Sequence, residues 1–542
     1  MGSRSSENWW LYALPCATSQ AWDCVSGSVP SWQRTSSWML LGFVAAMSFC
    51  VMILRWSSPG GCAWGALNYS CDIPGPRGWP VLGILLEMKS LAHRRLAQLA
   101  KQHSPALTAF SLGSTRVIIT SSPDVARELL NSSAFADRPL KQSAQELLFA
   151  RAIGFAPFGD YWRSLRRIAA NHLFSPRSIA ENQLRRQMET AHMLGAIYHH
   201  SLVGDGSVTV RTFLQHASLN NIMSSVFGRR MAMDQSSGEE CELQSVVREG
   251  FDLLGSFNWA DHLPALKLLD PQGVLQRCRK LLPRVKRFVQ NIIDDHRRHA
   301  KSNSPSTRQD FVDALLSLQE EEKLSDEDII SVLWEMIFRG TDTVAILTEW
   351  VLAELVIHPA VQERLHRELD EVVGSSRHVT DSDVSRMSYL QAVVKETLRL
   401  HPPGPLLSWA RLARHDAYIA GHHIPTGTSA MVNMWAITHD ESVWPDASSF
   451  KPERFMISDG GVEIDIRGND LRLAPFGAGR RVCPGRALGL ATVHLWLARL
   501  FHHFQWLPDP FHPVDLSEVL KLSCEMESPL SARPLKRLSL AF

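Results

Sequence analysis

The segment from Ser325 to His358 predicts a single helix of about 34 residues, roughly 50 Å long at about 1.5 Å per residue. Ser325 is a suitable N-cap, acidic residues fill the first turn, and Pro359 follows the last residue. The segment is apolar on most sides and lacks the charge pattern of a coiled coil. We therefore expect this helix to cross the middle of one large domain.

The remaining patterns predict a fold that is mostly α with small β-sheets. Helical periodicity dominates to about Leu400, and a last helix is expected from about Arg486 to Phe504. Strand patterns are short, with a hairpin at 107–120 and further strands between Ala417 and Ala436. No internal repeat and no second linker divides this part of the chain.

Composition excludes several classes of protein. The 45% hydrophobic content of the 542 residues can build a large core. The chain has 56 basic and 55 acidic residues, so its net charge of +1 gives no reason to expect a nucleic-acid partner. Nine cysteines without a C-x-x-C pair disfavour a disulfide framework or a zinc ribbon, and they suit a catalytic domain in a reducing compartment.

An apolar run free of charge, Trp38 to Leu54, predicts a transmembrane anchor near the N-terminus. The alternative is a cleaved signal peptide, which the late start and the missing A-x-A-like exit disfavour. The expected organisation is an N-terminal segment at 1–36, the anchor at 37–56, a linker with a proline-rich hinge at 57–80, and the main domain at 81–542. Charges around the run do not fix its orientation, so the cysteine argument alone places the main domain in the cytosol.

A glycine-rich segment before the last predicted helix carries the strongest chemical signal. Its glycines allow the backbone to approach a flat cofactor, and Cys483 precedes a helix N-terminus, a setting that favours a thiolate. Taken alone, a single cysteine such as Cys483 is more often an inert buried one. A dinucleotide-binding loop is disfavoured because the third glycine of that fingerprint is missing.

The same segment resembles the haem-binding signature of the cytochromes P-450, F-x-x-G-x-R-x-C-x-G. The residues that match it are Phe476, Gly479, Arg481, Cys483 and Gly485. The resemblance continues over about residues 74 to 542. It implies a haem b whose iron, the metal of the site, is bound by the Cys483 thiolate, with Arg481 placed near a propionate.

Two further motifs of that family are present. Trp162 and Arg166 match W-x-x-x-R and are expected near the second propionate, although alone such a pair is usually packing. Glu396 and Arg399 match E-x-x-R, and with Arg454 of the P-E-R-F element they imply a buried structural triad. A solvated surface pair is the alternative for the E-x-x-R match.

The long helix contains a proton-delivery motif in the same resemblance. Asp342 and Thr343 place an acid beside an alcohol, and we expect them to be catalytic. Arg339 stands where the family usually has a small residue. We expect it to pair with Glu335, four residues earlier, and the rival role is an anchor for a substrate carboxylate.

The finer resemblance is to plant microsomal members, especially the KLUH-like (78A) group. It implies a monooxygenase that uses O₂, NADPH through NADPH-cytochrome P450 reductase, and a lipophilic substrate such as a medium-chain fatty acid or a growth-signal precursor. It also implies the endoplasmic reticulum membrane, with the catalytic domain facing the cytosol. The alternatives are a haem-thiolate isomerase or dehydratase that needs no O₂, and a non-catalytic haem sensor.

Overall fold

The computed structural model describes residues 31–65, 71–203, 205–231, 238–301, 310–319, 322–407 and 410–540. The chain divides into two units between Leu54 and Arg55. The described part of the first unit belongs to helix α1 (Ser31–Ser57), and the second unit contains all the other helices and strands.

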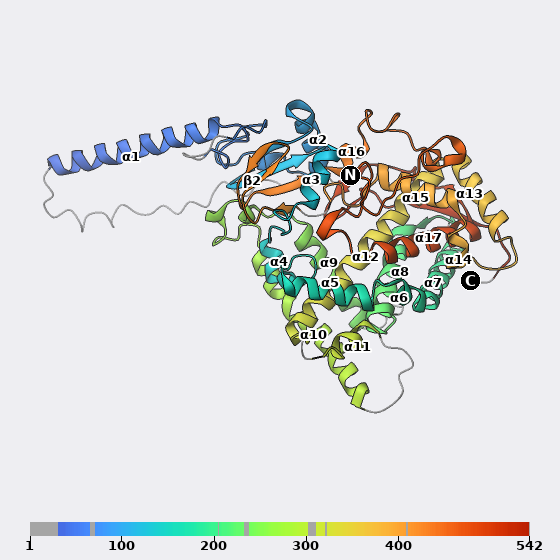
Figure 1. Ribbon diagram of the computed structural model, residues 1–542. Coiled ribbons are helices and arrows are strands. Elements are labelled where there is room, and N and C mark those ends of the chain that lie inside the picture. Colours follow the sequence, from blue (N-terminus) through green and yellow to red (C-terminus); the bar gives the residue numbers. More distant parts are fainter. Residues whose placement is uncertain are drawn as a thin grey trace, which may run out of the picture. The chain divides into compact units, whose positions relative to one another are not determined.

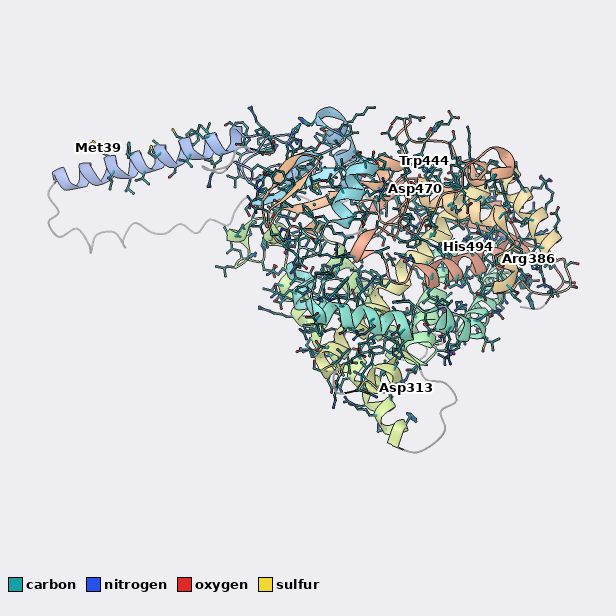
Figure 2. All side chains as sticks on the ribbon, in the orientation of Figure 1. Met39, Asp313, Arg386, Trp444, Asp470 and His494 are labelled. Atoms are coloured by element: carbon teal, nitrogen blue, oxygen red, sulfur yellow. The ribbon has the colours of Figure 1, made fainter. Side chains whose placement is uncertain are left out.

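Helix α1 has the properties expected of the anchor. Its most apolar stretch, Met39–Ser57, has a mean hydropathy of 2.0, and none of that stretch is buried. Figure 2 shows Met39 on this helix, and its side chain is 70% exposed. With 27 residues, α1 is about 40 Å long, which is enough to cross the hydrocarbon core of a bilayer. The helix is longer than the apolar run suggested, because it begins at Ser31.

The second unit is built mainly from helices, as the sequence predicts (Figure 1). Helix α12 (Asp326–Ile357) lies in its interior. The other helices are α2 (Ala92–His103), α3 (Pro123–Asn131), α4 (Gln142–Glu146), α5 (Asp160–His172), α6 (Pro176–Glu181), α7 (Gln183–Ser201), α8 (Val210–Phe227), α9 (Gly238–Gly255), α10 (Val274–Lys301), α11 (Phe311–Leu316), α13 (Pro359–Val372), α14 (Asp381–Val384), α15 (Ser388–Leu400), α16 (Met434–Thr438) and α17 (Arg486–His503).

Helix α12 confirms the central helix that the sequence predicts. The Ser325 side chain accepts the Asp328 N–H and so caps its first turn, and His358 ends it. Nearly all of its residues up to Phe338 and from Ala345 onward are buried. It packs against α8, α15 and α17, so residues far apart in the chain meet along it.

The sheets are small. A four-stranded sheet has the order β1-β2-β7-β4, with β2 and β7 parallel and the other neighbours antiparallel. A three-stranded antiparallel sheet has the order β3-β11-β8, and β5–β6 and β9–β10 are hairpins. The strands are β1 (Thr108–Leu112), β2 (Thr115–Thr120), β3 (Val208–Thr209), β4 (Arg411–Leu412), β5 (Ala417–Ile419), β6 (His422–Ile424), β7 (Ser429–Val432), β8 (Phe504–Pro508), β9 (Glu518–Leu520), β10 (Cys524–Met526) and β11 (Ser531–Lys536). The predicted hairpin at 107–120 is therefore present as β1 and β2.

The stretch after α1 is attached to the main sheet. The Trp64 indole is buried and donates to the Phe110 carbonyl at 3.0 Å, and Ala109 N–H donates to the Pro74 carbonyl at 2.9 Å. The Ser111 hydroxyl donates to the Gly60 carbonyl at 2.6 Å. The described parts of 57–80 thus pack along β1, which gives this proline-rich stretch a fixed course.

A buried ion-pair cluster joins α15 to the turn at Pro452–Phe455. Arg399 donates Nε and Nη2 to the two oxygens of Glu396, each at 2.8 Å, and both side chains have no exposed surface. Arg454 donates Nε to Glu396 at 3.2 Å. Arg399 also donates to the carbonyls of Thr438 and Ala447, at 2.9 and 2.7 Å. The three side chains therefore connect segments that are separate in sequence.

Glu396→Gln should destabilise the second unit by about 3–5 kcal/mol, because it leaves Arg399 buried without its counter-charge. The measurement is chemical unfolding followed by tryptophan fluorescence. Glu181→Gln is the matched control, since Glu181 pairs with Arg177 at the surface, where the expected loss is below about 1 kcal/mol. Equal losses for the two variants would contradict the role of the cluster.

Candidate functional site

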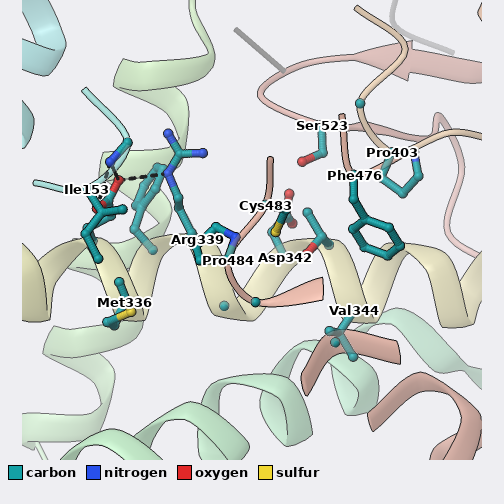
Figure 3. Close-up of a pocket in the computed structure, with 18 of the residues that line it drawn as sticks. Ile153, Met336, Arg339, Asp342, Val344, Pro403, Phe476, Cys483, Pro484 and Ser523 are labelled. Atoms are coloured by element: carbon teal, nitrogen blue, oxygen red, sulfur yellow. Dashed lines mark hydrogen bonds and ion pairs between the residues drawn. The ribbon is translucent and has the colours of Figure 1, made fainter. Parts of the chain in front are cut away.

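One cavity collects the predicted functional residues from distant parts of the chain. It lies between α12 and the loop before α17, and Figure 3 shows Cys483, Phe476 and Asp342 around it. Every predicted catalytic or cofactor-binding residue except Gly479 lines it: Trp162, Arg166, Asp342, Thr343, Phe476, Arg481, Cys483 and Gly485. Gly479 lies on the outer side of the same loop, where it lines a shallow depression with Arg486.

The loop that carries Cys483 is held in a tight conformation. Cys483 N–H donates to the Phe476 carbonyl at 3.0 Å, which closes the loop just before α17 begins. Gly479 has a φ of 65°, and a Cβ there would lie 2.1 Å from the Leu130 carbonyl oxygen. A glycine is therefore required at this position for the loop to pack against α3.

Two opposing effects set the charge of the Cys483 thiol. Burial is the largest effect and raises its pKa, whereas the hydrogen bond from Gly485 N–H and the positive charges of Arg339 and Arg166 lower it. The electropositive neighbours expected from the sequence are present, but burial outweighs them and keeps the free thiol protonated. A bound metal ion displaces such a proton, because only the thiolate is a good ligand.

A group of arginines at one side of the cavity outnumbers the acids beside it, Glu335 and Asp137. Nε and Nη1 of Arg138 are buried without a hydrogen-bond partner, and burial, followed by repulsion from Arg411, lowers the pKa of Arg138 well below its usual value. Arg411 is 6% exposed, and burial, followed by repulsion from Arg481 and Arg166, lowers its pKa to about 9. Buried cations of this kind require an anionic partner.

Arg138 and Arg411 were not among the residues predicted from the sequence. Arg138 lies between Asp137 and Pro139, directly after the apolar run Ala134–Ala136, and Arg411 lies between Ala410 and Leu412. An arginine next to apolar residues is a usable signal for a buried charge. The signal does not say which cavity the side chain enters, because that depends on how β4 packs beside the loop of Cys483.

Arg481 and Trp162 fix the loop at 152–156. Arg481 donates to the carbonyls of Ala136 and Ala156, at 2.7 and 2.6 Å, and its guanidinium lies 4.4 Å from the centre of the Trp162 ring. The Trp162 indole donates to the Ile153 carbonyl at 2.9 Å. The Arg481 guanidinium group, which was expected to face a carboxylate, therefore also donates hydrogen bonds to backbone carbonyls in this structure.

Arg166 connects α5 directly to the loop of Cys483. Its Nη1 donates to the Val482 carbonyl at 2.9 Å, and its guanidinium lies 5.6 Å from the centre of the Trp162 ring. Burial is the largest effect on Arg166 and lowers its pKa. Trp162 and Arg166 thus lie together at the cavity, as their spacing of four residues predicts.

Asp342 and Thr343 face the cavity from α12. Burial is the largest effect on Asp342 and raises its pKa to about 6, with a further increase from Glu525, while a hydrogen bond from the Ser523 hydroxyl lowers it. Figure 3 shows Asp342 and Ser523 side by side. The Thr343 side chain is open to the cavity, and it is the neighbouring Thr341 that donates to the carbonyl four residues back, at 2.8 Å.

Gly340 has a packing role. A Cβ on Gly340 would lie 2.3 Å from Cδ1 of Ile222, so this glycine allows α8 to approach α12 closely. Gly340 also borders the cavity.

The residues around the cavity fit a haem group. Cys483 would supply a thiolate ligand to the iron, apolar side chains such as Phe476 and Leu488 would contact the flat macrocycle, and the arginines around Arg138 would bind its two carboxylates. The unpartnered nitrogens of Arg138 are the observation on which this fit depends. A fold of central helix, cysteine loop and small sheets around such a cavity defines a haem-thiolate enzyme.

The cytochrome P450 family model matches residues 73–527. The chain belongs to the cytochrome P450 family, so it is a haem-thiolate monooxygenase. It is 53% identical to Cytochrome P450 78A11 of Oryza sativa subsp. japonica, over 98% of this chain and 96% of that protein. It is 54% identical to Cytochrome P450 78A9 of Arabidopsis thaliana, over 90% and 92%. The Flavonoid 3'-monooxygenase CYP75B137 of Crocosmia x crocosmiiflora is 36% identical over 86% and 92%. The resemblance to the 78A group is confirmed.

Ser523→Ala should raise the pKa of Asp342 above its value of about 6, because the variant removes a hydrogen bond that stabilises the charged carboxylate. The fraction of protonated Asp342 at pH 7 should therefore increase. The measurement is pH-difference infrared spectroscopy of the carboxyl stretch, assigned with Asp342→Asn. Ser517→Ala is the control, because Ser517 is exposed and lies directly before the same hairpin. If Asp342 titrates at the same pH in Ser523→Ala and Ser517→Ala, the hydrogen bond from Ser523 is ruled out.

Proposed function

We propose that this enzyme inserts one oxygen atom of O₂ into a lipophilic substrate, using electrons from NADPH that NADPH-cytochrome P450 reductase delivers. The single observation that supports the proposal is the cavity in which Cys483, the unbalanced arginines and the Asp342–Thr343 pair meet. When bound there, haem b with a thiolate ligand supplies O₂ activation and O–O bond cleavage.

We assign the cofactor-holding roles to residues on two sides of the cavity. Cys483 binds the iron, and Arg138, Arg166 and Arg411 bind the propionates. Arg481 and Trp162 belong to the same cofactor-binding group, because they fix the loop at 152–156 beside these arginines. Phe476, Gly479 and Gly485 shape the loop that presents the cysteine. The Glu396, Arg399 and Arg454 cluster stabilises the core around the cofactor and takes no part in the chemistry.

Asp342 and Thr343 are the proposed catalytic residues. A carboxyl group with a pKa of about 6 exchanges protons readily near neutral pH. The Thr343 hydroxyl lies in the next position, open to the cavity, and can hold a water molecule that carries the proton onward. The presence of this acid–alcohol pair favours a monooxygenase over an isomerase or dehydratase, because a rearrangement without O₂ needs no delivery of protons to oxygen.

The substrate side of the cavity is apolar. Phe149, Ile153, Phe251, Leu407 and Leu522 line it, from four separate segments. These walls suit a lipophilic molecule, such as a medium-chain fatty acid or a growth-signal precursor. Product analysis with the reductase, NADPH and a lipid extract tests the proposal. Products that carry oxygen from O₂ support it, NADPH-independent rearrangement would favour the isomerase, and ligand binding without product would favour the sensor.

The reductase is proposed to bind over the outer face of the loop of Cys483. Arg127, Arg467 and Arg486 surround a shallow depression there, and its lining contains no acid. Arg163 and Arg167 on α5 pair with Asp160 and Glu322, so they contribute less free charge. A basic surface next to the thiolate favours an acidic electron donor.

We propose that the enzyme is anchored in the endoplasmic reticulum membrane, with its catalytic domain facing the cytosol. The exposed apolar surface of α1 supports the anchor, and the free thiols of Cys62, Cys71 and Cys278 suit a reducing compartment. The proposed organisation keeps a segment at 1–36, the anchor at 37–56, the proline-rich stretch at 57–80 and the monooxygenase domain at 81–542.

Cys483→Ser should abolish the strongly red-shifted Soret band of the reduced carbonyl adduct, because serine does not give a thiolate ligand. The measurement is the difference spectrum of the reduced protein with and without carbon monoxide. Cys62→Ser should retain the band, since Cys62 lies in the stretch along β1, and it is the matched control. A Cys483→Ser protein with an unchanged band would reject this ligand assignment.

Thr343→Ala should uncouple NADPH consumption from product formation, because loss of the hydroxyl removes the proposed proton carrier while the binding pocket remains. NADPH oxidation should continue, hydrogen peroxide should increase, and product per NADPH should fall by about tenfold or more. Thr341→Ala changes the adjacent threonine, whose hydroxyl is bonded to the helix backbone, and should keep its coupling. Equal coupling in both variants would remove Thr343 from the mechanism.

A further inference from the structure

An ion pair inside the cavity wall connects α12 to the loop at 152–156. Arg339 donates Nε to Oε1 of Glu335 at 3.0 Å, so the pair expected from their spacing is confirmed. The Gly154 N–H donates to both oxygens of Glu335, at 2.8 and 3.1 Å. The Glu335 side chain is 1% exposed, and that of Arg339 is 34% exposed. We call Glu335, Arg339 and the Gly154 amide the clasp.

The loop leaves no space for a side chain at its contact with the clasp. A Cβ on Gly154 would lie 2.3 Å from Oε1 of Glu335 and 2.5 Å from Nη2 of Arg339. The Arg339 guanidinium also lies 5.7 Å from the centre of the Phe155 ring, the next residue of the loop. Figure 3 shows Arg339 on the side of Ile153 and Asp342 on the side of Ser523, so the two α12 side chains face opposite parts of the cavity.

The same loop is held from its other side by Arg481 and Trp162. Arg481 donates to the carbonyls of Ile153 and Ala156, at 3.3 and 2.6 Å, and Trp162 donates to that of Ile153. On the side of α12, the Glu335 carboxylate accepts the Gly154 N–H. The loop carbonyls thus accept from Arg481 and Trp162 on one side, and the Gly154 N–H donates to Glu335 on the other. The loop is therefore fixed between α5 and α12.

The charge of Arg339 is already balanced in this arrangement. Glu335 is the buried acid beside it, and Arg138 lies close enough for its pKa to be affected by both. A substrate carboxylate at Arg339 would have to displace Glu335, which would leave a buried carboxylate and the Gly154 N–H without their partners. That exchange is unfavourable, because each lost partner costs free energy.

We propose that the clasp holds the loop at 152–156 against α12, so that Arg339 positions the wall of the substrate cavity and does not bind a substrate carboxylate. If the proposed function holds, this role of Arg339 has a consequence for substrates. The part of the substrate that lies next to the haem is uncharged. Arg339 is therefore a positioning residue that selects substrates through the shape of the cavity.

Hydrogen exchange in the holoenzyme tests the clasp without reference to activity. In Glu335→Ala, amides of the peptide that spans 152–156 should exchange about tenfold faster, because a hydrogen bond to a charged group is lost. Arg339→Ala should give a smaller increase, and Arg339→Lys should restore much of the protection. Glu327→Ala changes an exposed acid of the first turn of α12 and is the control. Unchanged exchange in Glu335→Ala would overturn the proposal.

A glycine pair gives a second test that leaves both charges in place. Gly154→Ala places a methyl group against the clasp and should also speed exchange in the loop. Gly159→Ala is the matched control, since a Cβ there meets nothing within 4 Å and its φ of 179° suits any residue. Equal exchange in the two variants would show that the contact at Gly154 does not hold the loop.

Ligand titration separates positioning from anchoring. Dodecanoic acid and dodecan-1-ol are titrated into the wild-type and Arg339→Ala holoenzymes, followed by the haem spectrum. The ratio of the two dissociation constants should change by less than about twofold between the wild type and Arg339→Ala. If Arg339→Ala binds the acid about tenfold more weakly and the alcohol as before, Arg339 anchors the carboxylate and the proposal is overturned. If neither probe binds the wild-type enzyme, the lipophilic substrate of the proposed function fails, and the hydrogen-exchange result still decides the clasp.

Discussion

Buried positive charge is the constraint on which the interior of this protein depends. Arginines approach one cavity from α5, α12, β4 and the loop of Cys483, and a guanidinium group cannot lie in an apolar interior without partners. Three solutions occur side by side. Arg481 binds backbone carbonyls, Arg339 binds a buried carboxylate, and Arg138 has two buried nitrogens without a hydrogen-bond partner, which suit a bound anion. The walls of the cavity therefore specify a dianionic cofactor as much as the cysteine does.

Helix α12 makes this arrangement possible because it is long and mostly buried, and because polar residues gather in its middle. The nine residues from Glu335 to Thr343 include an ion pair, a glycine, an acid and an alcohol. Each has a separate partner: Glu335 holds the loop at 152–156, Gly340 receives α8, and Asp342 contacts the β9–β10 hairpin. The buried apolar residues on either side of this polar centre supply the packing that stabilises it.

Local signals predicted much of the fold. The cap at Ser325 and the proline after His358 gave both ends of α12, and the last helix and the β1–β2 hairpin also lie where their patterns indicate. The site was predicted where a motif combined rare residue types at fixed spacing, as around Cys483. Partners across the chain could not be predicted. Nothing in the sequence says that Arg411 points toward Arg481, that Gly154 N–H meets Glu335, or that Ile222 covers Gly340, because these contacts depend on how whole elements dock.

The unbalanced arginines also make the folded chain depend on its cofactor. Without two carboxylates beside them, these groups repel one another and lose hydration, so the free energy of unfolding is lower for the apoprotein than for the loaded enzyme. Less stable chains expose their unfolded state more often to proteases. We therefore expect the amount of this enzyme in a cell to depend on the supply of haem at the time of synthesis, because haem-free chains are degraded sooner.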